Sequence, residues 1–246
     1  MVKYDQRWAL ITGASAGLGA AYANALMMQG ANLILVARRK ERLDAIAQKA
    51  KAMGRKTLVI TSDLSQPNAP DEIMAQIEAA GISVDILINN AGFGLPGTYT
   101  ETSWEAQRDF ITLMVTSYAH LTHLALSPMK ARGYGRIINV ASLAGLIPSA
   151  SGHTLYGASK AFLIGFTQSL AAECSGTNVN ISACCPGFTY TEFHDVNGSR
   201  EEMNKLPSFM IMPVEPVVEG SLKAVERQHT TYVPGLLNKF LAAFAR

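Results

Sequence analysis

A hydroxyl, a phenol and an ammonium group fall close together in the middle of the sequence, at Ser142, Tyr156 and Lys160. Tyr156 and Lys160 are four residues apart, so on a helix they share one face, one turn from each other. A free phenol has a pKa of about 10, and a nearby cation lowers that value by stabilising the phenolate. Such a phenol can protonate a carbonyl oxygen or take a proton from an alcohol, and a serine hydroxyl can hydrogen-bond the same oxygen. Taken alone, the pair also fits an ordinary exposed tyrosine and lysine on a helix.

The segments on either side of these residues predict the elements that position them. Residues 136–141 form a short apolar, β-branched run, which predicts a buried strand ending at Ser142. Residues 158–174 carry small and apolar side chains at helical spacing, which predicts a helix that begins near Tyr156. The three groups can therefore converge where this strand ends and this helix begins.

A glycine-rich turn near the start of the chain predicts a dinucleotide site. Residues 8–12 form an apolar strand, three glycines follow at Gly13, Gly17 and Gly19, and residues 20–29 form an alanine-rich helix. Glycines allow a tight turn and let a pyrophosphate approach the free amides of the helix N-terminus. The spacing differs from the common Gly-x-Gly-x-x-Gly, and a tight strand–helix connection without a ligand remains the alternative.

The end of the second strand, residues 32–36, indicates which dinucleotide is preferred. About 20 residues after the glycine turn, where an acidic residue would bind the ribose 2′-hydroxyl of NAD, the chain has Ala37 followed by Arg38. An arginine suits a 2′-phosphate, and a hydrogen bond to a charged group corresponds to a roughly ten- to hundredfold preference. The sequence therefore predicts NADP(H) over NAD(H). Arg39, Lys40 and Arg42 are interpreted as the solvated start of the next helix.

The remaining strands end in polar or turn residues. Asp63 follows a strand at 57–60, and its carboxylate could meet an adenine amino group or cap the helix beyond Pro67. Asn90 follows a strand at 84–88, and Pro186 follows a strand at 179–184. With a last strand at 230–233, strands alternating with helices predict a parallel α/β sheet, whose ligands bind beyond the strand carboxyl ends. His120 and His123, in a helix expected from Ser103 to about Pro128, are interpreted as core or interface residues without metal.

Composition sets the class of protein. The chain has 246 residues, a length that favours one domain spanning residues 1–246. Its content of 48% hydrophobic and 16% charged residues argues against disorder. A net charge of +2 indicates no nucleic-acid partner. Three cysteines, Cys174, Cys184 and Cys185, have no metal-binding spacing and predict reduced core thiols. With no apolar signal segment or membrane span, we expect a cytoplasmic protein.

The motifs together resemble those of the short-chain dehydrogenase/reductase superfamily, in its single-domain branch and over nearly the whole chain. They are Thr-Gly-Ala-Ser-Ala-Gly-Leu-Gly at 12–19, Asn-Asn-Ala-Gly at 89–92, Ser142 with Tyr156-x-x-x-Lys160, and Pro186-Gly187. The resemblance implies a Rossmann-type, doubly wound sheet of seven parallel strands with helices on both faces. It also implies a nicotinamide cofactor and hydride transfer to or from a carbonyl or alcohol carbon.

The same resemblance assigns roles to residues. It makes Tyr156 the acid/base, has Ser142 orient the substrate oxygen, and has Lys160 bind the nicotinamide ribose and lower the pKa of Tyr156. The expected cofactor contacts are Gly13, Ser15, Gly17, Leu18 and Gly19 at the pyrophosphate, Asp63 and Leu64 at the adenine, Asn90 and Gly92 at the adjacent ribose, and Pro186, Gly187, Phe188 and Thr189 at the carboxamide.

One residue departs from the family pattern. Where the family has an asparagine that helps to hold a proton-relay water, this chain has Met114, whose thioether donates no hydrogen bond. We therefore expect an active enzyme with an altered relay, and keep a dinucleotide-binding sensor or scaffold with little turnover as the alternative. An epimerase or dehydratase would need a larger C-terminal substrate domain.

The substrate side is less defined by the sequence. Residues 189–212 are expected to form a lid, and apolar side chains suggest carbonyl reduction of a substrate with an apolar body: Phe93, Leu95, Leu143, Leu146, Phe188, Phe193 and Met203. Since members of the family usually pair through the long helix and the Tyr156 helix, we expect a homodimer or homotetramer.

Overall fold

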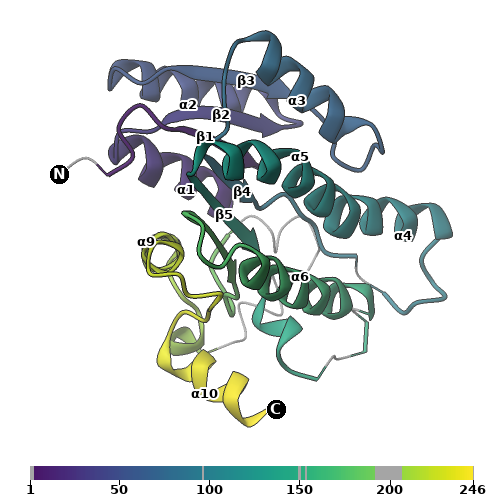
Figure 1. The fold of residues 1–246 in the computed structure, drawn as a ribbon. Helices are drawn as coiled ribbons and strands as arrows, with labels where there is room; N and C mark the ends of the chain where they lie inside the picture. Colours follow the sequence, from purple (N-terminus) through teal and green to yellow (C-terminus); the bar gives the residue numbers. More distant parts are fainter. Residues whose placement is uncertain (1–2, 96, 149–150, 153, 192–206, 246) are drawn as a thin grey trace.

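A seven-stranded sheet forms the centre of the molecule, in a computed structural model that describes residues 3–95, 97–148, 151–152, 154–191 and 207–245 (Figure 1). All neighbouring strands are parallel, in the order β3-β2-β1-β4-β5-β6-β7. The strands are β1 (Trp8–Thr12), β2 (Asn32–Ala37), β3 (Thr57–Thr61), β4 (Ile86–Asn89), β5 (Gly135–Val140), β6 (Val179–Cys184) and β7 (Thr231–Tyr232). The strand order reverses between β1 and β4, which opens a crevice at their carboxyl ends.

Helices cover both faces of this sheet, so the expected doubly wound α/β fold is confirmed. One core lies between the sheet and α1 (Gly17–Met28), α2 (Lys40–Ala52) and α9 (Val214–Glu226). The other lies under α3 (Ala69–Ala79), α4 (Trp104–Ile111), α5 (Ser117–Arg132) and α6 (Thr154–Glu173). The apolar runs read from the sequence form the strands, because a strand covered on both faces buries every side chain, as β2 and β6 do.

A buried polar network holds the two strands that lead to the site against α6. Asn89 Nδ2 in β4 donates to Asn139 Oδ1 in β5 at 2.9 Å, and Asn139 Nδ2 donates to Thr167 Oγ1 in α6 at 2.9 Å. All three side chains are fully buried. A buried amide without partners is costly, so this network fixes one arrangement of the two strands and the helix.

The long helix expected from Ser103 to about Pro128 is instead two α-helices joined by a π-helical turn. Ser103 Oγ accepts from the Ala106 amide and caps α4, as expected. The π-helical segment Thr112–Thr116 separates α4 from α5, and α5 continues through Pro128 to Arg132. β-branched residues lower helix propensity, and π-turns occur most often at functional sites.

The last helix, α10 (Leu236–Phe244), packs through Asn238 and Ala242 rather than through its large apolar side chains. Asn238 and Ala242 are buried, whereas Leu236, Phe240 and Phe244 are exposed. Within the described ranges, no helix combines the length and apolar character needed to cross a bilayer.

Candidate active site

The glycine turn after β1 is closed too tightly for side chains at two of its glycines. Gly13 has φ +64°, and a Cβ there would come 2.8 Å from the Asn90 amide nitrogen. A Cβ on Gly19 would overlap the Gly13 carbonyl. The backbone of α1 therefore begins directly beside β1, with no side-chain cap at its N-terminus. Its free amides can receive a pyrophosphate, so the residues present fit the dinucleotide that the sequence predicts.

Asn90 holds this turn from the neighbouring strand. Its Nδ2 donates to the Thr12 carbonyl at 2.9 Å and to the Gly13 carbonyl at 3.4 Å. In the other direction, Thr12 Oγ1 accepts from the amides of Asn90 and Ala91 at 2.9 and 3.0 Å. Thr12 and Asn90 thus lock the ends of β1 and β4 together at the strand-order reversal.

Two arginines stand at the end of β2, and only one of them was assigned to the cofactor from sequence. Arg38 is 70% exposed and lies 3.9 Å from Asp63 Oδ2. Arg39, interpreted from sequence as a solvated helix start, donates from Nε and Nη2 to Ser15 Oγ at 3.3 and 3.2 Å. The structure therefore links the glycine turn to Arg39, which the sequence pattern missed because contacts between loops leave no periodic signal.

Asp63 makes a local turn rather than capping a helix. Its Oδ1 accepts from the Ser65 amide and hydroxyl at 3.0 and 2.9 Å. Since α3 begins at Ala69 after Asn68, the alternative in which Asp63 caps that helix is wrong. Leu64 next to it is buried, and Ser117 Oγ donates to its carbonyl at 2.7 Å, which ties this loop to α5.

The three residues proposed for chemistry meet where β5 ends and α6 begins. The Ser142 hydroxyl lies near enough to the Tyr156 phenol to lower its pKa, and Ser142 Oγ accepts from the Ala144 amide at 3.1 Å. Lys160, one turn after Tyr156, is 4% exposed, and its Nζ lies 5.6 Å from the centre of the Tyr156 ring. This Nζ donates to the Val140 carbonyl at 2.8 Å. The strand end and the helix start thus converge as the spacing predicts.

Burial decides the proton affinities of this group. Burial lowers the pKa of Lys160 to about 7, because the ammonium form loses its hydration. Burial raises the pKa of Tyr156, and the hydrogen bond from Ser142 partly offsets that rise by stabilising the phenolate. At the 5.6 Å between Nζ and the ring centre, a protonated Lys160 would stabilise an ionised Tyr156.

The loop after β6 borders the same crevice. The Pro186 carbonyl accepts from the Leu143 amide at 2.8 Å, which joins this loop to the segment after Ser142. A Cβ on Gly187 would come 2.5 Å from Asn238 Oδ1, so α10 lies directly behind the loop. Thr189 is buried, donates to the Gly187 carbonyl at 3.1 Å and pairs with Met212 in a short parallel bridge.

This bridge closes the base of the expected lid. Residues 192–206, and with them Phe193 and Met203, lie outside the described residues. Of the other side chains expected to form an apolar pocket, Phe188 is 44% exposed, and Phe93 packs edge-on against Phe110 with ring centres 5.4 Å apart.

Met114 occupies the π-helical turn and is fully buried. A Cβ on Gly92 would come 2.9 Å from its sulfur, so the thioether lies against the Asn-Asn-Ala-Gly segment. A thioether there fills space next to the crevice and supplies no hydrogen-bond donor.

The two histidines of α5 have separate neighbours. His120 Nε2 lies 3.3 Å from Asp71 Oδ1 of α3, and His123 lines a surface pocket between α5 and α6. Among the described residues, no cluster of three or more histidine, cysteine or acidic side chains could hold a metal ion.

Comparison with known proteins identifies the family. A family profile described as short chain dehydrogenase matches residues 7–202 of the chain. The chain belongs to the short-chain dehydrogenase family. It is an oxidoreductase of that family, whose fold binds nicotinamide cofactors and whose substrates are small molecules.

Individual relatives agree with this assignment. The ketoacyl reductase HetN of Nostoc sp. is 37% identical over 91% of this chain and 77% of its own length. The 7beta-hydroxysteroid dehydrogenase of Collinsella aerofaciens is 33% identical over 77% of this chain and 71% of its own length. A solved short-chain dehydrogenase from Sphingobium yanoikuyae, in complex with NADPH, is 32% identical, with a TM-score of 0.86 and coverage of 97% and 92%.

Proposed function

We propose that this short-chain dehydrogenase transfers a hydride between NADP(H) and a carbonyl or alcohol carbon of a small substrate with an apolar body. One observation carries the proposal: the Ser142 hydroxyl at the end of β5 lies near the Tyr156 phenol, and Nζ of buried Lys160 lies 5.6 Å from the centre of the Tyr156 ring. This group lies at the same sheet edge as the glycine turn, because both follow the carboxyl ends of parallel strands.

The preference for NADP(H) rests on the end of β2. Arg38 and Arg39 place two guanidinium groups there, and Arg39 already contacts Ser15 of the glycine turn. Ala37 leaves no carboxylate at this position to bind a 2′-hydroxyl or repel a phosphate. Planar guanidinium donors bind phosphate oxygens in pairs, which favours a 2′-phosphate.

The chain's own residues supply the proton side of the reaction. The bound nicotinamide would supply or accept the hydride. Ser142 would hydrogen-bond the substrate oxygen and orient it toward Tyr156. In reduction, Tyr156 Oη gives its proton to the carbonyl oxygen as that oxygen becomes negative; in oxidation, the phenolate takes the alcohol proton. Protonated Lys160 stabilises this phenolate, and the Val140 carbonyl keeps its ammonium at the crevice.

Carbonyl reduction with NADPH tests the proposal directly. The purified protein would be assayed at 340 nm with ketones and aldehydes of increasing apolar size, with small polar sugars as the contrast. We expect turnover with apolar ketones and its loss by a factor of about 10² to 10⁴ in Tyr156→Phe. Unchanged turnover in Tyr156→Phe, or sugars as the better substrates, would contradict the respective part of the proposal. Tight NADPH binding without turnover on any carbonyl would instead favour a sensor or scaffold.

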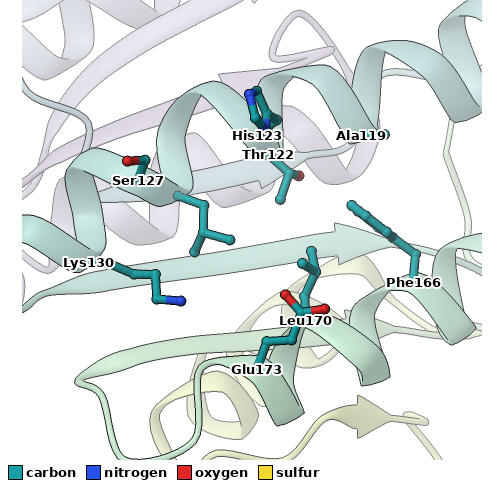
Figure 2. A pocket seen from close by; sticks show the side chains of 9 residues that line it. Ala119, Thr122, His123, Ser127, Lys130, Phe166, Leu170 and Glu173 are labelled. Carbon is teal, nitrogen blue, oxygen red and sulfur yellow. The ribbon is translucent and has the colours of Figure 1, made fainter.

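We further propose that the enzyme is a homo-oligomer that pairs through α5 and α6. A pocket of about 410 Å³ lies between these helices. Figure 2 shows the side chains of both helices that line it. Phe162 of α6 is 42% exposed and stacks on Phe166, with ring centres 5.6 Å apart. Exposed aromatic side chains beside a groove are typical of subunit interfaces. Light scattering should give a dimer or tetramer, and Phe162→Asp should shift it toward the monomer.

We also propose that residues 1–246 act as one catalytic domain in the cytoplasm. Cys174, Cys184 and Cys185 are buried free thiols, which is typical of a reducing compartment. Cell fractionation would test the location, and a single cooperative unfolding transition would support the single domain.

A further inference from the structure

A second tyrosine lies as close to Lys160 as Tyr156 does. Tyr118 in α5 is 1% exposed, and its ring centre lies 5.7 Å from Lys160 Nζ. The ring centre of Tyr156 lies 5.6 Å from the same nitrogen. The ammonium therefore has two aromatic rings within the range of cation–π attraction, which is about 6 Å.

The Tyr118 ring is held in place by its own hydroxyl. Tyr118 Oη donates to the Ala91 carbonyl at 2.9 Å, inside the Asn-Asn-Ala-Gly segment at the end of β4. Burial and the nearby Tyr156 both raise the pKa of Tyr118, so this phenol stays neutral over the working pH range. A neutral, fixed phenol cannot act as a second acid, but it presents a fixed ring to Lys160.

Tyr118 follows Met114 by one turn, beyond the π-helical segment that carries Met114. Both side chains meet the same strand end: the Met114 sulfur lies against Gly92, and the Tyr118 hydroxyl binds the Ala91 carbonyl. Where the family has a polar asparagine, this chain thus has an apolar side chain with an aromatic ring nearby. Such surroundings lack the donor that would hold a relay water.

We propose that Tyr118 is a positioning residue that keeps Lys160 protonated and in place beside Tyr156. The inference rests on the proposed function, because it concerns the proton affinity of the Tyr156–Lys160 pair. Among the described residues, this buried ammonium has one carbonyl acceptor, so it loses its proton readily, and two aromatic faces offset part of the lost hydration. Tyr118 thereby takes over stabilisation of the charged lysine in a site whose asparagine has been replaced.

The other groups around Lys160 do not supply this charge stabilisation. The Val140 carbonyl of β5 accepts one hydrogen bond. Cys185 after β6 is the titratable neighbour on that side, and burial raises its pKa, so its thiol is neutral near pH 7. On α6 itself, Tyr156 is the titratable neighbour of Lys160. Gly145, in the turn after Ser142, packs on the backbone of the same helix and brings no ionisable group.

The test is the pH dependence of alcohol oxidation with NADP⁺ in the full-length enzyme, comparing Tyr118→Leu with Tyr118→Phe. Loss of the ring in Tyr118→Leu destabilises the Lys160 ammonium, which in turn destabilises the Tyr156 phenolate. The acidic limb of kcat should therefore move to higher pH by about one unit, the size expected from a desolvated cation–π contact. Tyr118→Phe keeps the ring and should stay within a few tenths of a pH unit of the wild type.

Isosteric replacements keep the test valid if Tyr118→Leu fails to fold. Phenylalanine and 3,4,5-trifluorophenylalanine at position 118 have nearly the same shape, but fluorine weakens the negative face of the ring. If the acidic limb of kcat lies at higher pH in the fluorinated enzyme than in Tyr118→Phe, the proposal is supported. In parallel, the NMR resonance of Lys160 in [ε-¹³C]lysine-labelled protein, assigned by its loss in Lys160→Met, should titrate at lower pH in that enzyme.

Equal limbs and equal Lys160 titrations in the two enzymes would overturn the proposal, as would a Tyr118→Phe shift as large as that of Tyr118→Leu. The proposed function fails separately, if Tyr156→Phe retains full turnover. If Tyr156→Phe is inactive but the acidic limb of kcat does not move in the variants at position 118, only the role of Tyr118 is refuted.

Discussion

Replacing Lys160 by methionine should stabilise the fold near neutral pH while removing activity. The pKa of this lysine falls from 10.5 to about 7 because its ammonium is buried. Each pH unit of that difference is worth 1.36 kcal/mol, so keeping Lys160 protonated costs the folded state about 4 to 5 kcal/mol at pH 7. Methionine fills a similar volume without a charge. It leaves the Val140 carbonyl without its donor, which costs about 1 to 3 kcal/mol. The expected net gain at pH 7 is about 2 kcal/mol.

The stability difference between the wild type and Lys160→Met should depend on pH. Between pH 7 and 10.5 the unfolded chain holds the lysine proton and the folded chain does not, so wild-type stability rises with pH in that window. The variant lacks this rise. The free energy of unfolding of Lys160→Met should therefore exceed that of the wild type at pH 7, and the two curves should cross near pH 9, where the wild type has recovered about 2 kcal/mol.

Urea unfolding of the cofactor-free protein at pH 6, 7, 8 and 9 would measure both curves. Taking the difference between variant and wild type removes the other groups that titrate. Lys49→Met, which removes an exposed lysine of α2, is the matched control and should leave a difference that is flat with pH. Parallel curves for Lys160→Met and the wild type would refute the argument, because they would mean that Lys160 keeps a water-like pKa in the folded protein.

Three further substitutions test the rest of the site, and Gly165→Ala serves as a control for one of them. Arg39→Ala should raise the Kd for NADPH by roughly ten- to hundredfold and leave that for NADH unchanged in a nicotinamide fluorescence titration; equal changes for both would exclude a phosphate contact. Gly19→Ala places a methyl on the Gly13 carbonyl and should lower Tm and NADPH affinity together, whereas Gly165→Ala, whose methyl meets open space within α6, should stabilise the fold by about 0.5 to 1 kcal/mol. Gly187→Ala forces Asn238 aside and moves the loop that borders the crevice, so it should lower kcat; an unchanged kcat would show that the loop shifts freely.

The parts of the fold that are local in sequence could be predicted. Buried strands such as β2 show as continuous apolar runs, and the glycine turn shows as glycines between such a run and a helix. The convergence of Ser142, Tyr156 and Lys160 follows from the same reasoning, because a parallel sheet puts all strand carboxyl ends at one edge.

The features that the sequence did not predict depend on tertiary contacts or on small backbone changes. The π-helical turn Thr112–Thr116 adds no residue type that distinguishes it from an α-helix. Pro128 was expected to end the long helix, yet α5 continues through it to Arg132 and is followed by Gly133, whose φ of +66° suits a glycine. The contacts of Arg39 with Ser15 and of Tyr118 with Lys160 join segments far apart in the chain, so no pattern of spacing indicates them.

The position of α10 behind the loop after β6 has a practical consequence for work on this protein. Asn238 donates to the Pro234 carbonyl at 2.9 Å, contacts the Met212 sulfur at 3.4 Å and lies against Gly187. A bulky affinity tag or fluorescent fusion placed directly after this helix would pull on the residues that border the crevice. Fusions at the other end avoid this, because the chain enters β1 at the amino end of that strand, whereas the glycine turn follows its carboxyl end. Kinetic constants from C-terminally tagged enzyme should therefore be compared with those after tag removal.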